Sequence, residues 1–332
     1  MIFHRACMAP VRAVFHRLAF ALILSGSVSC APGRLDAEDM KKDEIRRRLQ
    51  QHLHYLSVGL GERCLFRPQT LKASEDYVAR ELESLGYPVW RQPFICQGVE
   101  VANVIAGHPD PQGYYVLGAH FDTVAGTPGA DDNASGVAVL LEAARLARKA
   151  PTASPWIFVG FTTEEPPAYF TPYMGSRVFA RQARKNRENL LGMLCLESVG
   201  YFVQEPDSQQ IPLALRFLGY STTGNYLGLV ANWHSRPLLQ KLEKAFQATC
   251  ALPVASLAVP LGGSLIPEAR LSDHANFWDE GYQAVMLTDT AFLRNPNYHT
   301  CHDTIDTLNL DAMVEITLSL VHFVRDAGID IM

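Results

Sequence analysis

Hydrophobic and polar residues alternate along this chain in two patterns. Short, mostly apolar runs are typical of buried strands, and they predict strands over residues 88–95, 99–107, 114–119, 155–162, 190–198, 226–232 and 283–289. Apolar residues at helical spacing predict helices over residues 36–57, 70–87, 134–150, 174–186, 235–249 and 310–327. Because strands that are apolar throughout need cover on both faces, this order predicts an α/β sandwich with a largely buried sheet flanked by helices.

The first 30 residues have a different character. Arg5, Arg12 and Arg17 occur without any acidic residue, the apolar run "LAFALIL" follows, and small residues lead to Cys30. This pattern predicts an export signal over residues 1–30 and therefore a periplasmic, secreted or lipid-anchored protein. The alternative is an ordinary N-terminal helix. Cys30 is a candidate for lipid attachment, and the apolar run is too short to span a bilayer, so no membrane span is expected in the mature chain.

The rest of the chain, residues 31–332, is predicted to form a single domain. It contains neither an internal repeat nor a linker rich in glycine, proline or serine. A hydrophobic content of 48% in 332 residues excludes disorder of the whole chain. The formal net charge of −5 argues against a nucleic-acid partner, because binding to phosphates requires a basic surface.

Side chains that can bind metal follow four of the predicted strands. These side chains are His120 and Asp122, then Glu164 and Glu165, then Glu197, and finally His299 and His302. A single histidine or glutamate after a strand usually has an ordinary structural role. Functional sites of α/β sheets, however, form at the carboxyl ends of the strands, so four such strands together predict a common site.

The types of side chain indicate the metal. Imidazole and carboxylate groups favour zinc, or less often manganese or cobalt, and the sequence has no Cys-x-x-Cys pair that would form a cysteine-based zinc site. Two imidazoles with three or four carboxylates exceed the needs of one four-coordinate ion and predict two ions. Within the adjacent pairs Asp131–Asp132 and Glu164–Glu165, residue chemistry alone does not assign the roles, although one glutamate can bind metal while the other acts as a base.

Five motifs in order resemble the co-catalytic zinc aminopeptidases, peptidase family twenty-eight. They are "HFD", "GADDNASG", "TEEPP" with "MGS", "LES" and "YHTCHDT", and "SDHANF" resembles a further motif of the family. The resemblance extends from Leu71 to the C-terminus. This family also contains glutamate carboxypeptidase II and has the glutaminyl cyclases as relatives. The resemblance implies a three-layer sandwich with a mixed central sheet.

The resemblance also implies roles for individual residues. His120 and Glu197 match ligands of a first zinc, Glu165 and His299 match ligands of a second, and Asp132 matches the aspartate that bridges them. Glu164 matches the general base and Asp122 the acid that orients His120. Tyr298, beside His299, is a candidate hydrogen-bond donor to the oxyanion or a packed aromatic residue. His302 lies outside the motif.

Two positions depart from the family pattern. Glu197 stands where the best-known aminopeptidases have aspartate, and Pro166 and Pro167 replace a turn that is commonly rich in glycine. The expected function is a zinc-dependent exopeptidase acting on peptides, with aminopeptidase activity. The alternatives are a glutaminyl-cyclase-like acyltransferase with one zinc, a carboxypeptidase in which Arg294 holds the substrate carboxylate, and a catalytically inactive binding module.

Overall fold

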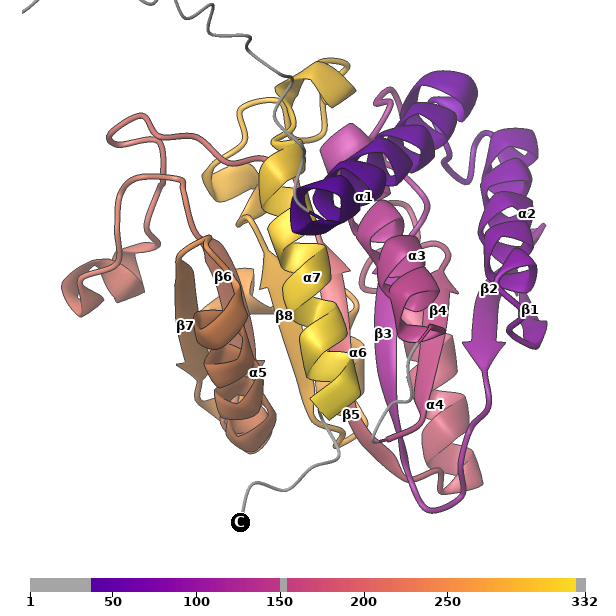
Figure 1. Cartoon of the computed structure of the whole chain (residues 1–332). Coiled ribbons are helices and arrows are strands. Elements are labelled where there is room, and N and C mark those ends of the chain that lie inside the picture. The colour runs from indigo at the N-terminus through magenta and orange to yellow at the C-terminus, as the bar shows by residue number, and fades with distance from the viewer. Residues whose placement is uncertain (1–36, 150–153, 327–332) are drawn as a thin grey trace, which may run out of the picture.

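The computed structural model describes residues 37–149 and 154–326, so the predicted export signal and Cys30 lie outside the described residues. Eight strands form a sheet in the order β1-β2-β4-β3-β5-β8-β6-β7 (Figure 1). The strands are β1 Val89–Cys96, β2 Val99–Gly107, β3 Tyr114–His120, β4 Trp156–Phe161, β5 Leu190–Glu197, β6 Leu227–Asn232, β7 Val254–Val259 and β8 Ala284–Thr288.

The centre of this sheet is parallel and its flanks are partly antiparallel. β3 pairs in parallel with β4 and β5, and β5 pairs in parallel with β8. β2 and β6 run antiparallel to their neighbours β4 and β8. The predicted mixed sheet is therefore confirmed, and its four adjacent parallel strands end at one edge.

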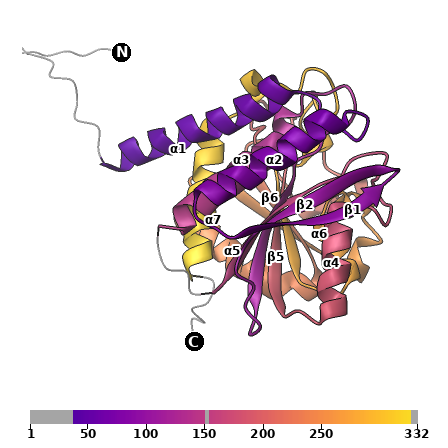
Figure 2. The same ribbon diagram turned by 90° about the vertical axis from the view of Figure 1, so that its right-hand side faces the viewer.

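Helices cover both faces of the sheet. The helices are α1 Ala37–Leu53, α2 Pro68–Ser84, α3 Gly136–Ala147, α4 Gly175–Asn186, α5 Arg236–Thr249, α6 His274–Asp279 and α7 Leu310–Asp326. Figure 2 shows α1, α2, α3, α5 and α7 on one side of the sheet and α4 and α6 on the other. The predicted three-layer sandwich is thus confirmed.

The core has two parts because successive side chains of a strand point to opposite faces. All seven residues of β3 are buried. Leu117 and Ala119 pack in the cluster beneath α1, α3 and α7, whereas Tyr114 and Val116 pack in the cluster beneath α4 and α6. Burial on both faces explains why the central strands are almost entirely apolar.

Two elements are absent from the sequence prediction, β7 and α6. β7 lies at the edge of the sheet between Pro253 and Pro260, and five of its six side chains are only half-buried. α6 has six residues, which is too short for a helical periodicity to emerge. Within the described ranges, no helix has both the length and the hydrophobicity needed to cross a membrane.

Candidate metal centre

The predicted metal-binding residues converge at the carboxyl end of the parallel strands. His120 is the last residue of β3, and Glu197 is the last residue of β5. Glu164 and Glu165 follow the end of β4, and His299 lies on the segment after β8. Because β4, β3, β5 and β8 are adjacent in the sheet, these side chains lie at one site.

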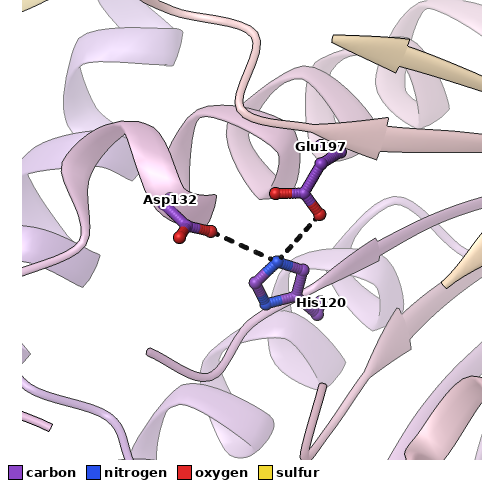
Figure 3. Close-up of side chains that lie close together, drawn as sticks. All are labelled: His120, Asp132 and Glu197. Atoms are coloured by element: carbon purple, nitrogen blue, oxygen red, sulfur yellow. Dashed lines mark ion pairs between the residues drawn. The ribbon is translucent and has the colours of Figure 1, made fainter. Parts of the chain in front are cut away.

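A first group consists of His120, Asp132 and Glu197, all three of which are buried (Figure 3). Nε2 of His120 lies 3.2 Å from Oε2 of Glu197 and 3.4 Å from Oδ1 of Asp132. The three side chains come from β3, from β5 and from the loop before α3. Their facing atoms could contact one cation together.

A second group consists of Asp132, Glu165 and His299. Nε2 of His299 lies 3.0 Å from Oδ2 of Asp132 and 3.2 Å from Oε1 of Glu165. Asp132 thus directs one carboxylate oxygen to each group. This arrangement offers two cation positions with one shared carboxylate, as in two-metal sites.

Several of the facing atoms in the two groups lack hydrogen-bond partners, as expected of metal ligands. Nε2 of His120, both carboxylate oxygens of Asp132 and Oε1 of Glu165 are buried and have no hydrogen-bond partner among the described residues. Their close contacts lack hydrogen-bond geometry, although buried polar atoms in proteins almost always have a partner. Imidazole nitrogens and carboxylate oxygens are also the atoms that bind zinc when no thiolate is present. The residues therefore fit zinc.

The electrostatics of the metal-free site point the same way. Burial lowers the pKa of His120, but the charges of Glu197, Asp122 and Asp132 outweigh it and hold the pKa well above its usual value. For His299, burial is likewise outweighed by Asp132 and Glu165, which raise its pKa to about 10. Burial raises the pKa of Glu165 to about 8. The site therefore concentrates negative charge around both imidazoles.

Asp122 connects the first histidine to the glutamate pair. Its Oδ1 lies 3.5 Å from Nδ1 of His120. The same carboxylate accepts the backbone N–H groups of Glu164, at 3.1 Å, and Glu165, at 3.0 Å. A carboxylate beside a metal-binding histidine helps to fix the orientation of the ring, here together with the backbone carbonyl of Asp122, which lies 3.3 Å from the same Nδ1. The carboxylate also fixes the backbone of the loop after β4.

Asp303 has a similar function for Asp132 and was not among the predicted site residues. Its carboxylate accepts the backbone N–H of Asp131 at 2.8 Å and that of Asp132 at 3.1 Å. Asp131 itself accepts hydrogen bonds from Asn295 and the backbone of Gly200, outside both groups. The structure therefore distinguishes the roles of Asp131 and Asp132, which the residue types alone could not distinguish. The signal for Asp303 was its place in "HDT".

Arg63 is a second residue that the sequence did not reveal. Its buried guanidinium donates hydrogen bonds to five backbone carbonyls, which belong to Leu56, Gly61, Phe121, Pro128 and Gly129. These bonds tie the loop between His120 and Asp132 to the segment before α2. This loop requires glycine at position 129. Gly129 has φ of +58°, and a Cβ atom there would lie 2.4 Å from the carbonyl oxygen of Asp132.

Glu164 differs from its neighbour Glu165. It is buried beside the cluster but belongs to neither group. Burial raises its pKa well above the usual value, and the charges of Glu165, Glu197 and Asp273 add to this effect. A buried carboxyl group with a raised pKa, next to candidate metal ligands, has the properties of an acid–base group.

Two other predicted positions contact the cluster, and a third does not. The ring of Tyr298 stacks on that of His299, with centroids 3.8 Å apart. Ser272 of "SDHANF" donates a hydrogen bond of 2.6 Å to Oε2 of Glu197, which places this motif at the site. His302 is exposed and belongs to neither group.

The guanidinium of Arg294 makes its contacts with other residues of the protein. Its Nε donates to Oε1 of Gln209 at 2.8 Å, and its Nη2 donates to the carbonyl of Tyr226 at 2.9 Å. The guanidinium also lies over the rings of Phe202 and Tyr226. These contacts occupy the group that a carboxypeptidase would use for the substrate carboxylate.

An apolar pocket opens beside the cluster. Glu197 and Tyr298 contribute to its wall, next to apolar side chains from β6, β7, β8 and the loops around them. These apolar side chains are Ile211, Leu215, Val230, Leu257, Ile266, Met286 and Phe292. The pocket can accept a large apolar side chain within reach of the candidate metal ligands.

Comparison with known sequences identifies the family. The profile of Peptidase family M28 matches residues 103–324. The chain is 33% identical over 277 residues to the Escherichia coli protein YfbL, covering 81% of this chain and 84% of YfbL. It is 26% identical to a protein of Arthroderma otae named "Probable leucine aminopeptidase", of which it spans 56% of the length.

Solved structures show the same fold. The Legionella pneumophila LapA aminopeptidase superposes with a TM-score of 0.68 at 20% identity, over 90% of this chain and 77% of LapA. The glutaminyl cyclase of Fimbriiglobus ruber gives a TM-score of 0.62 at 19% identity, over 86% and 94% of the two chains. The family match implies a zinc-dependent hydrolase, in agreement with the buried imidazole and carboxylate groups. The chain belongs to peptidase family M28 and is a metallopeptidase.

Proposed function

We propose that this protein is an aminopeptidase that binds two zinc ions and hydrolyses the first peptide bond of a peptide. One observation carries the proposal: two groups of potential ligands share Asp132, while Glu164 lies beside them and belongs to neither. His120, Asp132 and Glu197 would hold one ion, and Asp132, Glu165 and His299 the other. Bound zinc ions promote deprotonation of the attacking water and stabilise negative charge on the scissile carbonyl.

Glu164 would move the proton during the reaction. Its carboxylate takes a proton from the attacking water and later donates it to the leaving amine. Asp122 keeps Glu164 in place through the backbone N–H and orients His120 at the same time.

Tyr298 and the apolar pocket would determine how the substrate binds. The pocket lies against Glu197 and Tyr298, so a side chain inserted there places the adjacent carbonyl near the cluster. The hydroxyl group of Tyr298 would then donate a hydrogen bond to the oxyanion. The apolar lining favours substrates that begin with a large apolar residue such as leucine.

Export of the protein belongs to the same proposal. Three arginines, an apolar run and small residues before Cys30 support an export signal over residues 1–30, and Cys30 is a candidate for lipid attachment. Residues 31–332 would then form the mature enzyme as a single domain. Mass spectrometry of protein from its native host tests this, because an unprocessed Met1 on a cytoplasmic protein would contradict it.

The activity is tested by product analysis with two peptides. A peptide with an N-terminal leucine should release free leucine, and a peptide with an N-terminal glutamine should not cyclise to pyroglutamate. Cyclisation without hydrolysis would instead support the cyclase alternative, which needs only one zinc. No turnover of either peptide by the zinc-loaded protein would support an inactive binding module.

A further inference from the structure

A tyrosine on the loop after the glutamate pair has a hydroxyl group with no assigned role. The oxygen of Tyr169 is buried and has no hydrogen-bond partner among the described residues. Its ring is only half-buried and packs against Phe170, with the centroids 4.4 Å apart. A buried phenol without a partner is costly, which makes a function in ligand binding a reasonable explanation.

The glutamates of the candidate metal centre act on this hydroxyl group through their charge. Burial raises the pKa of Tyr169, and the negative charges of Glu164, Glu197 and Glu165 raise it further. Tyr169 nevertheless donates a hydrogen bond to none of these carboxylates. The hydroxyl group is therefore under the influence of these carboxylates, and none of them accepts its hydrogen.

The loop that carries Tyr169 is fixed at both ends. The backbone N–H of Ala168 donates to the carbonyl of Glu165 at 3.0 Å. At the other end, Oγ1 of Thr163 donates to the carbonyl of Tyr173 at 2.7 Å. Because these bonds tie the loop to the glutamate pair, Tyr169 has a defined position relative to Glu164.

Tyr169 and Tyr298 differ in their relation to the apolar pocket. Tyr298 and Glu197 line the apolar pocket proposed for the first side chain of the substrate, whereas Tyr169 is not part of that lining. Tyr169 instead shares its loop with Phe170 and Tyr173, whose surfaces are 57% and 49% exposed. With the first residue of the substrate in the pocket, this loop would face the residue that follows the scissile bond.

We propose that the Tyr169 hydroxyl group donates a hydrogen bond to the backbone carbonyl of the second substrate residue, while Phe170 contacts that residue's side chain. This inference rests on the proposed aminopeptidase function and extends it to the leaving side of the substrate. It makes the protein an enzyme for true peptides, because an amide or anilide lacks the second carbonyl. Tyr169 is a binding residue in this reaction.

The test compares two substrates with two variants of the zinc-loaded protein. Tyr169→Phe removes only the hydroxyl group, and Tyr173→Phe is the matched control on the same loop. For the tripeptide Leu-Gly-Gly, Tyr169→Phe should lower kcat/KM about tenfold, as for loss of one hydrogen bond. For leucine p-nitroanilide, which has no second residue, kcat/KM should stay within about twofold of the wild-type value. Tyr173→Phe should leave both values unchanged.

Other outcomes separate this inference from the proposed function. An equal loss on both substrates would place the Tyr169 contact on the first residue and overturn the inference, as would no loss on either. If the wild-type protein cleaves neither substrate, the aminopeptidase proposal fails and this inference fails with it.

A measurement on the wild-type protein is independent of how the variant folds. The protein should cleave leucyl-glycinamide about tenfold faster than leucine ethylamide, which lacks the second carbonyl. Equal rates on the two compounds would overturn the inference even if Tyr169→Phe does not fold.

Discussion

Oδ2 of Asp122 accepts a hydrogen bond of 3.0 Å from the backbone N–H of Glu165. Since Oδ1 of the same carboxylate lies 3.5 Å from Nδ1 of His120, one side chain positions candidate ligands from both groups. Asp122 itself belongs to neither group. Its contribution to metal binding should therefore be large although it contacts no metal.

Asp122→Asn tests this positioning role. Asparagine keeps the size of the side chain but has only one acceptor oxygen and no charge, so it cannot serve His120, Glu164 and Glu165 together. We expect zinc affinity to fall about 10–100-fold, as for loss of a carboxylate partner of a metal-binding histidine. Competition with a chelator measures this affinity, with Asp110→Asn on the surface as the control. Wild-type affinity in Asp122→Asn would contradict the role.

Variants of the adjacent residues Glu164 and Glu165 can distinguish the proposed general base from the proposed metal ligand. Glu164→Gln should keep both metals and lower kcat by about 10²–10⁴, because only proton transfer is lost, while KM should change little. Glu165→Gln should instead weaken the binding of one ion, and added zinc should partly restore activity. Metal content and kcat of each variant are the measurements. Equal metal loss in both variants would show that the two roles are assigned wrongly.

Asp303 offers a test of the backbone that carries Asp132. Asp303→Asn keeps one acceptor oxygen for the two N–H groups of Asp131 and Asp132 and removes a buried charge. We expect weaker binding of both ions, because Asp132 contributes an oxygen to each group. The exposed Asp306 provides the matched control in Asp306→Asn. Chelator competition that leaves Asp303→Asn unchanged would show that the loop holds Asp132 without this carboxylate.

Zinc binding should release protons at neutral pH. The pKa of His299 is raised to about 10 in the metal-free protein, so its imidazole is protonated at pH 7 and must lose that proton to bind zinc. Zinc affinity should therefore rise as the pH increases from 7 towards 10. Calorimetry in buffers with different ionisation enthalpies measures the release, and His302→Ala should not change it. An enthalpy that is independent of the buffer would contradict this expectation.

Much of the fold and the site follows from the sequence because of the parallel centre of the sheet. β3, β4, β5 and β8 are buried on both faces, so they are apolar throughout and easy to recognise, and the residues after them must meet at one edge. β7 does not follow, because a half-exposed edge strand between two prolines lacks that pattern.

The contacts that depend on distant segments could not be derived from local patterns. Asp303 lies more than 170 residues from the backbone groups that it fixes. Arg63 donates to carbonyl oxygens of residues that precede it and of residues that follow it in the sequence, and it has no local signature. The different directions of Asp131 and Asp132 likewise depend on Gly200, Asn295 and Asp303, which the chain brings together only on folding.

The number of zinc ions bound per chain tests the central claim most directly. The protein can be purified without chelator, loaded with zinc, freed of excess metal and weighed by native mass spectrometry. Because Asp132 directs one oxygen to each of two groups, the account predicts two ions per chain and the loss of one in His299→Ala. A plateau at one ion in the wild-type protein, unchanged in His299→Ala, would contradict the two-metal site and the mechanism built on it.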